Sequence, residues 1–375
     1  MPKVLVVTTE APDIMLGGVG FFNRLLWTEL EKREYPFKTC YLNLQGTKPS
    51  LVADIVVTPK LVLPFDSNPE SKALNISWTA RELLKPILDD YQPDVISLHE
   101  NGSILSFWPD MDRVQFTLHS SHVGLENYLA RTTQGLQAYW EQRFGVTKAK
   151  ALILHSHWAE RMTQQYLNED VHATKIFPIG LNFEDYQGEK IPHAKGKVVI
   201  SFFGRHTDSG KNFTAYMQAI ATLSEKYKNQ IEARLYSPTK ADSSIERYGI
   251  KVMPFVQGEK KKIAYAETDI VVMPSIRESF GIVGLEALLS NCELIATPGL
   301  GMDEYMPKDC ACPSNPEAIQ TRIMAIVDEK EDLRAKQRAN YFRDQVNKPE
   351  FLIEQMTSSY IEVWQEMLDK TVENK

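Results

Sequence analysis

Short apolar runs alternate with amphipathic segments along the chain, and this rhythm constrains the fold more than any single motif. In the first half, the runs that predict β-strands are 3–9, 37–44, 94–99, 114–120 and 151–156. The intervening segment 20–33 places apolar side chains at helical spacing, namely Phe21, Phe22, Leu25, Leu26 and Leu30. Strands that alternate with helices are typical of a parallel sheet. The sequence therefore predicts an α/β fold.

A second series of the same kind follows the polar segment 188–197, which is rich in Gly, Pro and Lys. Its predicted strands are 197–204, 231–237, 250–256, 269–275 and 292–298. The segment 350–370 then predicts an amphipathic helix, with Phe351, Leu352, Met356, Tyr360 and Trp364 on or near one stripe. A chain of 375 residues is too long for one ordinary core. We therefore predict two parallel-sheet domains with a linker at 188–197.

Charge and cysteine content argue against several classes of protein. The net charge is −7 and the basic residues form no polybasic block, so neither nucleic acid nor an anionic membrane is an expected partner. The first residues do not resemble a signal peptide, and no apolar stretch approaches the roughly 20 residues of a membrane-spanning helix. The four cysteines, Cys40, Cys292, Cys310 and Cys312, form no CxxC motif. Free thiols and a cytoplasmic location are therefore expected.

Loops that follow strands are the place to look for chemistry, because ligands of open parallel sheets bind outside the carboxyl ends of the strands. After the first strand, Gly17, Gly18 and Gly20 precede a predicted helix, where glycines let backbone amides approach a phosphate or a sugar. A tight turn is the alternative interpretation. The spacing is not GxGxxG, which removes the main support for a nicotinamide dehydrogenase.

Two loops in the second half carry charged residues. Arg205 follows one predicted strand and Lys211 precedes a helix, so both can converge on one anionic group, unless they are merely solvated. Glu278 and Glu286 stand eight residues apart around a Phe-Gly step, the first in a loop and the second in a helix that begins near Ile282. Amides that open this helix can bind a phosphate, with a carboxylate on each side for hydroxyls. The alternative is that Glu278 complements the helix dipole and Glu286 faces water.

The stretch "PSIRESFGIVGLEALLSN" (274–291) resembles the E-x7-E signature of retaining GT-B glycosyltransferases, particularly family four. Other motifs agree in order along the chain: "GGVG", "FTLHSSH", "ILHSHWAERM" with a Ser-capped helix, "FPIGLNFEDY" and the phosphate loop "FGRHTDSGKN". The sequence departs from the family's pattern at three places. One residue more than in the commonest family spacing separates Arg205 from Lys211, and Ile179 stands where the family usually has asparagine. The strand at 231–237 lacks the family's following G-x-G turn.

The resemblance implies the GT-B fold, in which two Rossmann-like parallel-sheet domains face each other across a cleft. The first would be an acceptor-binding domain at 1–187, completed by a C-terminal helix at about 350–375 that crosses back to it. The second, 188–349, would bind a nucleotide sugar. The implied activity is that of a metal-independent retaining hexosyltransferase, which moves a sugar from a nucleoside diphosphate sugar to a hydroxyl acceptor.

The resemblance also assigns residues. The implied catalytic residues are His119, Glu278, Arg205 and Lys211. The implied donor-binding residues are Gly17, Gly18, Arg205, Lys211, Glu278, Ser279, Phe280, Gly281, Ile282, Val283 and Glu286. Glu286 would bind the ribose, Glu278 the sugar hydroxyls, and the two cations would neutralise the leaving diphosphate. His119 would orient the donor sugar, and neither a metal nor a cofactor is expected.

Substrate identity and two rival functions stay open at this stage. A UDP-sugar is expected ahead of a GDP-sugar, although these residues do not distinguish uridine from guanosine. Asn101, Phe107 and Trp108 suit a saccharide or glycoconjugate acceptor, and a lipid-linked sugar or a protein side chain nearly as well. Peripheral contact with a membrane also stays open. The rivals are another GT-B enzyme, such as an epimerase or phosphorylase, and a catalytically silent subunit that keeps the fold.

Overall fold

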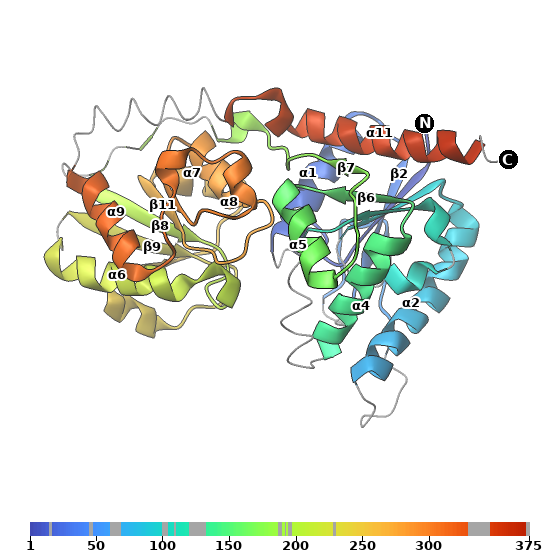
Figure 1. Ribbon diagram of the computed structural model, residues 1–375, viewed down its shortest axis with the longest axis horizontal. Helices are drawn as coiled ribbons and strands as arrows, with labels where there is room; N and C mark the ends of the chain where they lie inside the picture. The colour runs from blue at the N-terminus through green and yellow to red at the C-terminus, as the bar shows by residue number, and fades with distance from the viewer. Residues whose placement is uncertain are drawn as a thin grey trace. The chain divides into compact units, whose positions relative to one another are not determined.

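The computed structural model describes residues 1–14, 17–44, 48–60, 69–99, 104–108, 110–119, 133–186, 190–191, 193, 197–227, 230–328 and 346–372. The chain forms two compact units (Figure 1). The first consists of Met1–Gly180 and Ile353–Lys375, and the second of Leu181–Leu352. Each unit is built on its own parallel sheet, so the predicted pair of α/β domains is confirmed.

The sheet of the first unit is parallel throughout, in the order β3-β2-β1-β4-β5-β6-β7. Its strands are β1 (Val4–Thr8), β2 (Phe37–Leu42), β3 (Ile55–Val57), β4 (Val95–His99), β5 (Val114–Thr117), β6 (Ala151–Leu154) and β7 (Lys175–Ile176). Strands β1, β4, β5 and β6 are buried along their whole length, which explains their apolar runs. The two edge strands, β3 and β7, are three and two residues long, and the sequence pattern did not predict them.

Helices in the described part of the first unit are α1 (Gly18–Lys32), α2 (Pro69–Tyr91), α4 (Thr133–Lys148), α5 (His157–Leu167) and α11 (Ile353–Val372). Ser156 caps α5, as predicted, because its Oγ accepts a hydrogen bond from the Ala159 amide at 3.0 Å. The C-terminal helix α11 packs on α1 of this unit (Figure 1). Its Met356, Tyr360 and Trp364 are buried, which confirms most of the predicted stripe.

The second unit has a five-stranded parallel sheet in the order β10-β9-β8-β11-β12. The strands are β8 (Val198–Phe203), β9 (Ile231–Tyr236), β10 (Ile250–Met253), β11 (Ile270–Met273) and β12 (Glu293–Ala296). Helices α6 (Phe213–Lys226), α7 (Glu259–Ala266), α8 (Ile282–Leu289) and α9 (Pro316–Asp328) complete its described part. Each predicted strand of this half is present, and α8 begins at the predicted residue.

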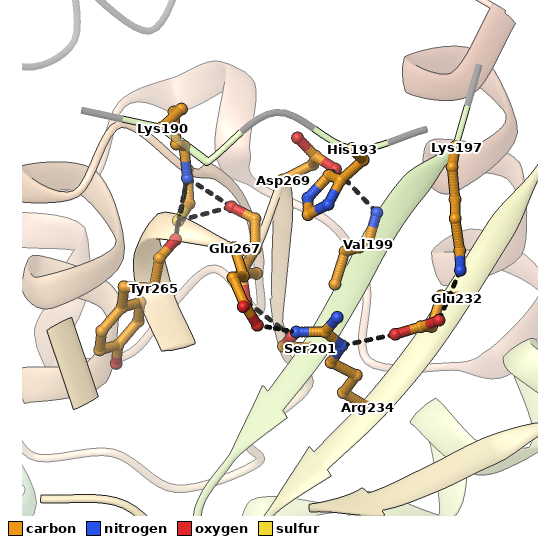
Figure 2. A network of polar contacts seen from close by, with 12 residues as sticks. Lys190, His193, Lys197, Val199, Ser201, Glu232, Arg234, Tyr265, Glu267 and Asp269 are labelled. Carbon is orange, nitrogen blue, oxygen red and sulfur yellow. Dashed lines mark hydrogen bonds and ion pairs between the residues drawn. The ribbon is translucent and has the colours of Figure 1, made fainter. Parts of the chain in front are cut away.

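The polar segment 188–197, predicted as a linker and as the start of the second domain, lies in the second unit, which begins at Leu181. Figure 2 shows how it is held at the amino ends of the strands. Lys190 donates to the backbone carbonyls of Tyr265, at 3.0 Å, and of Thr268. The His193 ring lies 3.5 Å from the Asp269 carboxylate, which itself accepts a hydrogen bond from the Val199 amide. The described residues of this segment are therefore fixed to the second unit, by carbonyls at the end of α7 and in the turn before β11 and by the Asp269 carboxylate.

The same end of the sheet carries a partly buried charge network that also appears in Figure 2. Arg234 contacts Glu232 and Glu267 at 2.8 and 2.6 Å, and Lys197 contacts Glu232 at 2.6 Å. Burial alone would raise the pKa of Glu232, but hydrogen bonds from Lys197, Lys251 and Arg234 outweigh it and lower the pKa to about 2. This network connects segments near the amino ends of the strands. The candidate site lies at the opposite, carboxyl ends.

Candidate active site

The loop after β8 is short and internally braced. Arg205 contacts the Asp208 carboxylate at 3.0 Å, and the other Asp208 oxygen accepts the Gly210 amide at 2.9 Å. Lys211 ends a 3-10 turn, and Asn212 then adopts a left-handed conformation (φ 50°) from which α6 starts. Asparagine tolerates this conformation better than most residues. The loop thus presents the two predicted cations, Arg205 and Lys211, at the start of α6.

Several contacts join the loop after β11 to the loop after β8, among them a hydrogen bond from Arg277 to Ser209 at 3.2 Å. The Ile276 amide donates to the Gly210 carbonyl at 2.9 Å. Lys211 Nζ lies 2.5 Å from Glu278 Oε2, with about 29% of the lysine and 13% of the glutamate side chain exposed. The structure therefore brings Lys211 into direct contact with Glu278, the first glutamate of the E-x7-E pattern.

Helix α8 begins directly after the Phe-Gly step. Gly281 has φ of 84°, a left-handed conformation that glycine adopts without strain. Ser279 and Phe280 are buried, whereas Ile282 and Val283 in the first helical turn are partly exposed. First-turn amides have no acceptor within their own helix. The predicted donor-binding run therefore divides into a buried part that shapes the turn and a partly exposed part that opens α8.

The loop after β12 packs against the backbone between Glu278 and Gly281. The Gly301 amide donates to the Glu278 carbonyl at 2.9 Å, and a Cβ atom on Gly301 would lie only 1.9 Å from the Ser279 carbonyl oxygen. The Tyr305 hydroxyl donates to the Gly281 carbonyl. Burial raises the pKa of Tyr305 well above its usual value, and the nearby Glu278 charge adds to the shift, so the phenol stays a donor. These contacts fix the backbone that carries Glu278.

Glu286, the second glutamate of the pattern, does not face water. It has no exposed surface, and its carboxylate accepts three hydrogen bonds. Oε1 accepts from the Tyr186 hydroxyl at 2.8 Å and from Lys261 Nζ at 2.5 Å, and Oε2 accepts from the Tyr265 hydroxyl at 2.8 Å. Burial raises the pKa of Tyr265 well above its usual value, and the charge of Glu286 raises it further. A carboxylate has about four acceptor positions, so three donors leave room for one more.

The glycine-rich loop in the first unit is occupied by a side chain of its own unit. Glu10 Oε2 accepts the Gly17 amide at 2.9 Å and the Gly20 amide at 3.1 Å. Gly18, the first residue of α1, is exposed. The carboxylate sits where the helix dipole favours an anion. The predicted donor-binding role of Gly17 would therefore require a ligand to share or displace Glu10.

His119 lies just beyond the end of β5, as predicted, and is partly exposed. Its Nε2 is 3.3 Å from Nδ1 of His99, its ring centroid is 5.1 Å from that of His155, and Phe22 packs edge-on against it at 4.6 Å. Burial, followed by the charges of His155 and His99, lowers the pKa of His119 well below its usual value. Burial also lowers the pKa of His99 to about 3 and that of His155 to about 4. All three rings are neutral at neutral pH.

The predicted residues thus fall into two groups, one in each unit. In the second unit, the loops after β8 and β11 and helix α8 carry Arg205, Lys211, Glu278, Glu286 and the run 279–283. Gly17, Gly18 and His119 belong to the first unit. Sequence reasoning missed Tyr186, Lys261 and Tyr265 around Glu286, and Glu10 at the glycine loop. Of the proposed acceptor residues, Asn101 lies outside the described residues, Phe107 is buried, and Trp108 is exposed. Phe107 therefore serves the core.

Comparison with known proteins finds a family model that matches part of the second unit. Residues 197–329 match the family model described as glycosyl transferases group 1. The matched segment lies within the second unit. The match includes Arg205, Lys211, Glu278 and Glu286, and it ends before α11. A segment of 77 residues, 20% of this chain, is also 32% identical to an uncharacterized glycosyltransferase of Methanocaldococcus jannaschii, and it spans 20% of that relative's length.

Solved structures resemble the whole chain. Sucrose-phosphate synthase from Thermosynechococcus elongatus has a TM-score of 0.78 at 16% identity, with 98% of this chain and 100% of that chain covered. WaaG, a glycosyltransferase involved in lipopolysaccharide biosynthesis, has a TM-score of 0.70 at 12% identity and covers 94% and 98% of the two chains. The UDP-forming trehalose-phosphate synthase from Burkholderia xenovorans has a TM-score of 0.68 at 11% identity and covers 97% and 100%. These likenesses show the GT-B fold.

The part of the chain that the structure describes contains neither a metal-binding cluster nor a membrane-spanning helix. No group of three or more His, Cys, Asp or Glu side chains is arranged there to hold a metal ion. None of the helices in the described ranges is both long and apolar enough to cross a membrane. The four cysteines are buried, and none of them is in a disulfide.

Proposed function

We propose that this protein is a retaining glycosyltransferase that moves a hexose from a nucleoside diphosphate sugar to a hydroxyl of a saccharide or glycoconjugate. The observation that carries the proposal is the ion pair between Lys211 and Glu278, which joins the loop after β8 to the loop that opens α8. It lies within the segment that matches the group 1 family. Cation, carboxylate and helix amides meet there at the carboxyl ends of two adjacent strands.

The leaving group explains the need for cations in this arrangement. When the bond between the sugar and the diphosphate breaks, negative charge grows on the diphosphate oxygens, and Lys211 and Arg205 would stabilise that charge. Both are already paired with carboxylates, Glu278 and Asp208. A diphosphate would compete for the ammonium of Lys211, which would free Glu278 to accept hydrogen bonds from sugar hydroxyls. The amides from Phe280 to Val283 would lie along the donor, and no metal is required in this scheme.

Glu286 would bind the ribose through its remaining acceptor position. Tyr186, Tyr265 and Lys261 hold its two oxygens in one orientation. Glu286 has no exposed surface, whereas Lys261 is about 20% exposed. Movement of the lysine side chain would therefore give a ribose hydroxyl access to that remaining position. His119 of the first unit would orient the donor sugar.

The names of two structural relatives inform the choice of donor and acceptor. One is a trehalose-phosphate synthase that forms UDP, and the other is a sucrose-phosphate synthase. By analogy we propose a UDP-sugar as the donor, with a hydroxyl of a sugar or sugar phosphate in the class of acceptors. Asn101 and Trp108 remain proposed acceptor residues.

Thermal stabilisation by nucleotides tests the donor site. A nucleoside diphosphate at a hundredfold excess over its Kd stabilises a protein by about 2.7 kcal/mol, which should raise the melting temperature by roughly 5 to 10 °C. We expect the largest shift with UDP or a UDP-sugar, unchanged in EDTA and abolished by Glu286→Ala. Glu317→Ala, which removes an exposed carboxylate of the same unit, is the matched control and should keep the full shift.

A second measurement separates an enzyme from a silent subunit. Purified protein supplied with the donor that gives the largest shift should release the nucleoside diphosphate slowly by hydrolysis, and Lys211→Met should reduce this rate about a hundredfold or more. If no nucleotide shifts the melting temperature, the chain is better described as a GT-B-fold interaction subunit. A shift that disappears in EDTA would overturn the metal-independent scheme.

A further inference from the structure

A chain of buried hydrogen bonds in the first unit runs from α11 through two strands to His119. Its members are Trp364, Gln115, Ser97 and His99, and none has exposed surface. Ser97 and His99 alternate along β4, and Gln115 is the register partner of Ser97 on β5. Polar side chains are unusual on strands buried in a parallel sheet, and each must be satisfied by a partner.

The indole of Trp364 fixes the direction of this chain, because an indole N–H can only donate. Trp364 Nε1 donates to Gln115 Oε1 at 3.2 Å, which identifies that atom as the amide oxygen. The amide nitrogen then donates to Thr117 Oγ1 at 2.8 Å. Gln115 Oε1 also lies 2.6 Å from Ser97 Oγ, and since a carbonyl oxygen cannot donate, the proton between them comes from Ser97.

The hydrogen bonds of Ser97 determine which ring nitrogens of His99 and His119 carry protons. Its only proton is given to Gln115, so Ser97 Oγ must accept from His99 Nε2, which lies 3.1 Å away. A neutral imidazole with its proton on Nε2 has a bare Nδ1. His99 Nδ1 therefore accepts from His119 Nε2 at 3.3 Å, and His119 in turn carries its proton on Nε2 and a lone pair on Nδ1.

We propose that Trp364, Gln115, Ser97 and His99 are positioning residues that set which ring nitrogen of His119 carries the proton. The opposite order, with every proton reversed, satisfies the same distances except at the indole, where it would bring two N–H groups face to face. Such a clash in a buried site leaves polar groups unpaired. His119 is thus held as an acceptor at Nδ1, which suits a hydroxyl group. That last consequence rests on the proposed glycosyl transfer, whereas the proton positions do not.

Nitrogen chemical shifts of the histidine rings test the inference directly. The full chain is labelled with 15N-histidine, and the His119 signals among the eight histidines are identified with His119→Gln. We expect His119 with a protonated Nε2 and a bare Nδ1. Trp364→Phe, which removes the indole donor, should give a mixture of the two forms. Ser97→Ala should act likewise, because His99 loses the acceptor for its Nε2 proton and can then donate to His119.

Tyr360→Phe is the matched control. Tyr360 contacts Thr117 at 3.0 Å, beside the chain but outside it, and phenylalanine keeps the ring that packs near His99. This variant should leave the His119 shifts unchanged. A proton on Nδ1 of His119 in the wild type would overturn the inference, as would an unchanged His119 in both Trp364→Phe and Ser97→Ala.

The rate of donor hydrolysis distinguishes this inference from the proposed function. In the variants whose His119 tautomer changes, we expect hydrolysis to slow by about tenfold, because the transition state loses roughly one hydrogen bond. Wild-type protein that shows the expected ring protons but hydrolyses no donor would refute the proposed function and leave the proton order standing. A variant with altered ring protons and an unchanged rate would refute the acceptor role of His119.

Discussion

At the scale of single residues, the most consequential contact is the one between Glu286 and Lys261. A carboxylate without exposed surface can remain ionised only if it is compensated, and here one ammonium and two phenols provide the compensation. The adjacent Lys262 makes a useful contrast. Its ammonium lies 2.9 Å from Asp185 and 3.3 Å from Glu259, side chains that are 43% and 76% exposed.

We expect Lys261→Met to destabilise the protein by about 2–3 kcal/mol, because it leaves a buried carboxylate without its cation. Lys262→Met should change the free energy of unfolding by less than about 1 kcal/mol, since exposed ion pairs contribute little. Urea unfolding of both lysine variants, of Glu286→Gln and of Lys261→Met combined with Glu286→Gln measures the coupling between Lys261 and Glu286. Equal losses for the two lysines would contradict the view that Lys261 neutralises Glu286.

At the scale of elements, loops and short helices around α8 carry the site, and two glycines in the loop after β12 have separable roles. Gly299 has φ of 84° with no atom near its missing Cβ, so only its backbone conformation requires glycine. Gly301 instead lies against the Ser279 carbonyl. One position therefore needs glycine for its dihedral angle and the other for space.

Gly301→Ala should displace the backbone between Glu278 and Gly281 and weaken nucleoside diphosphate binding by at least about tenfold, since displaced donors lose their geometry. Gly299→Ala should cost about 1–2 kcal/mol of stability through its left-handed conformation and leave the affinity nearly unchanged. Calorimetric titration with the nucleotide and urea unfolding of both variants separate these effects. If Gly299→Ala weakens binding as much as Gly301→Ala, the close contact is not what matters.

The sequence predicted elements well and side-chain partners poorly. Long apolar runs such as 94–99 and 269–275 predict strands because both faces of a parallel sheet are buried. Edge strands β3 and β7 are too short to leave such a pattern. The motif placed Lys211 and Glu278, but Tyr186 reaches Glu286 across 100 residues of sequence, a pairing that spacing does not encode. Ser97 and His99 did leave a signal, since two polar residues alternate on one face of an apolar run.

At the scale of the whole molecule, acid should destabilise the protein through its buried histidines. The pKa of His99 is lowered to about 3 and that of His155 to about 4, against about 6.5 in the unfolded chain. Below about pH 6.5 the unfolded state binds protons at these histidines that the folded state does not bind. The free energy of unfolding therefore decreases as the pH falls towards these pKa values. Each such histidine contributes a slope of up to about 1.4 kcal/mol per pH unit.

Urea unfolding between about pH 6.5 and pH 5, where most carboxylates stay ionised, measures this slope. His155→Gln should make it shallower by up to about 1.4 kcal/mol per pH unit, because glutamine can donate to the Phe177 carbonyl in place of the imidazole and does not titrate. His172→Gln removes a histidine whose side chain is 75% exposed and should leave the slope as in the wild type. Parallel slopes for all three proteins would contradict a role for the buried rings.

The contacts of α11 also set an order of assembly during synthesis. Tyr360 and Trp364 bond to Thr117 and Gln115, which precede them by 243 and 249 residues. At roughly 5–20 residues per second, β5 leaves the ribosome about 12–50 seconds before the helix that covers it. The second unit is synthesised entirely within that interval. The unit that comes first in the sequence is therefore the last to close its core, and until then its polar strand face stays open to water and to chaperones.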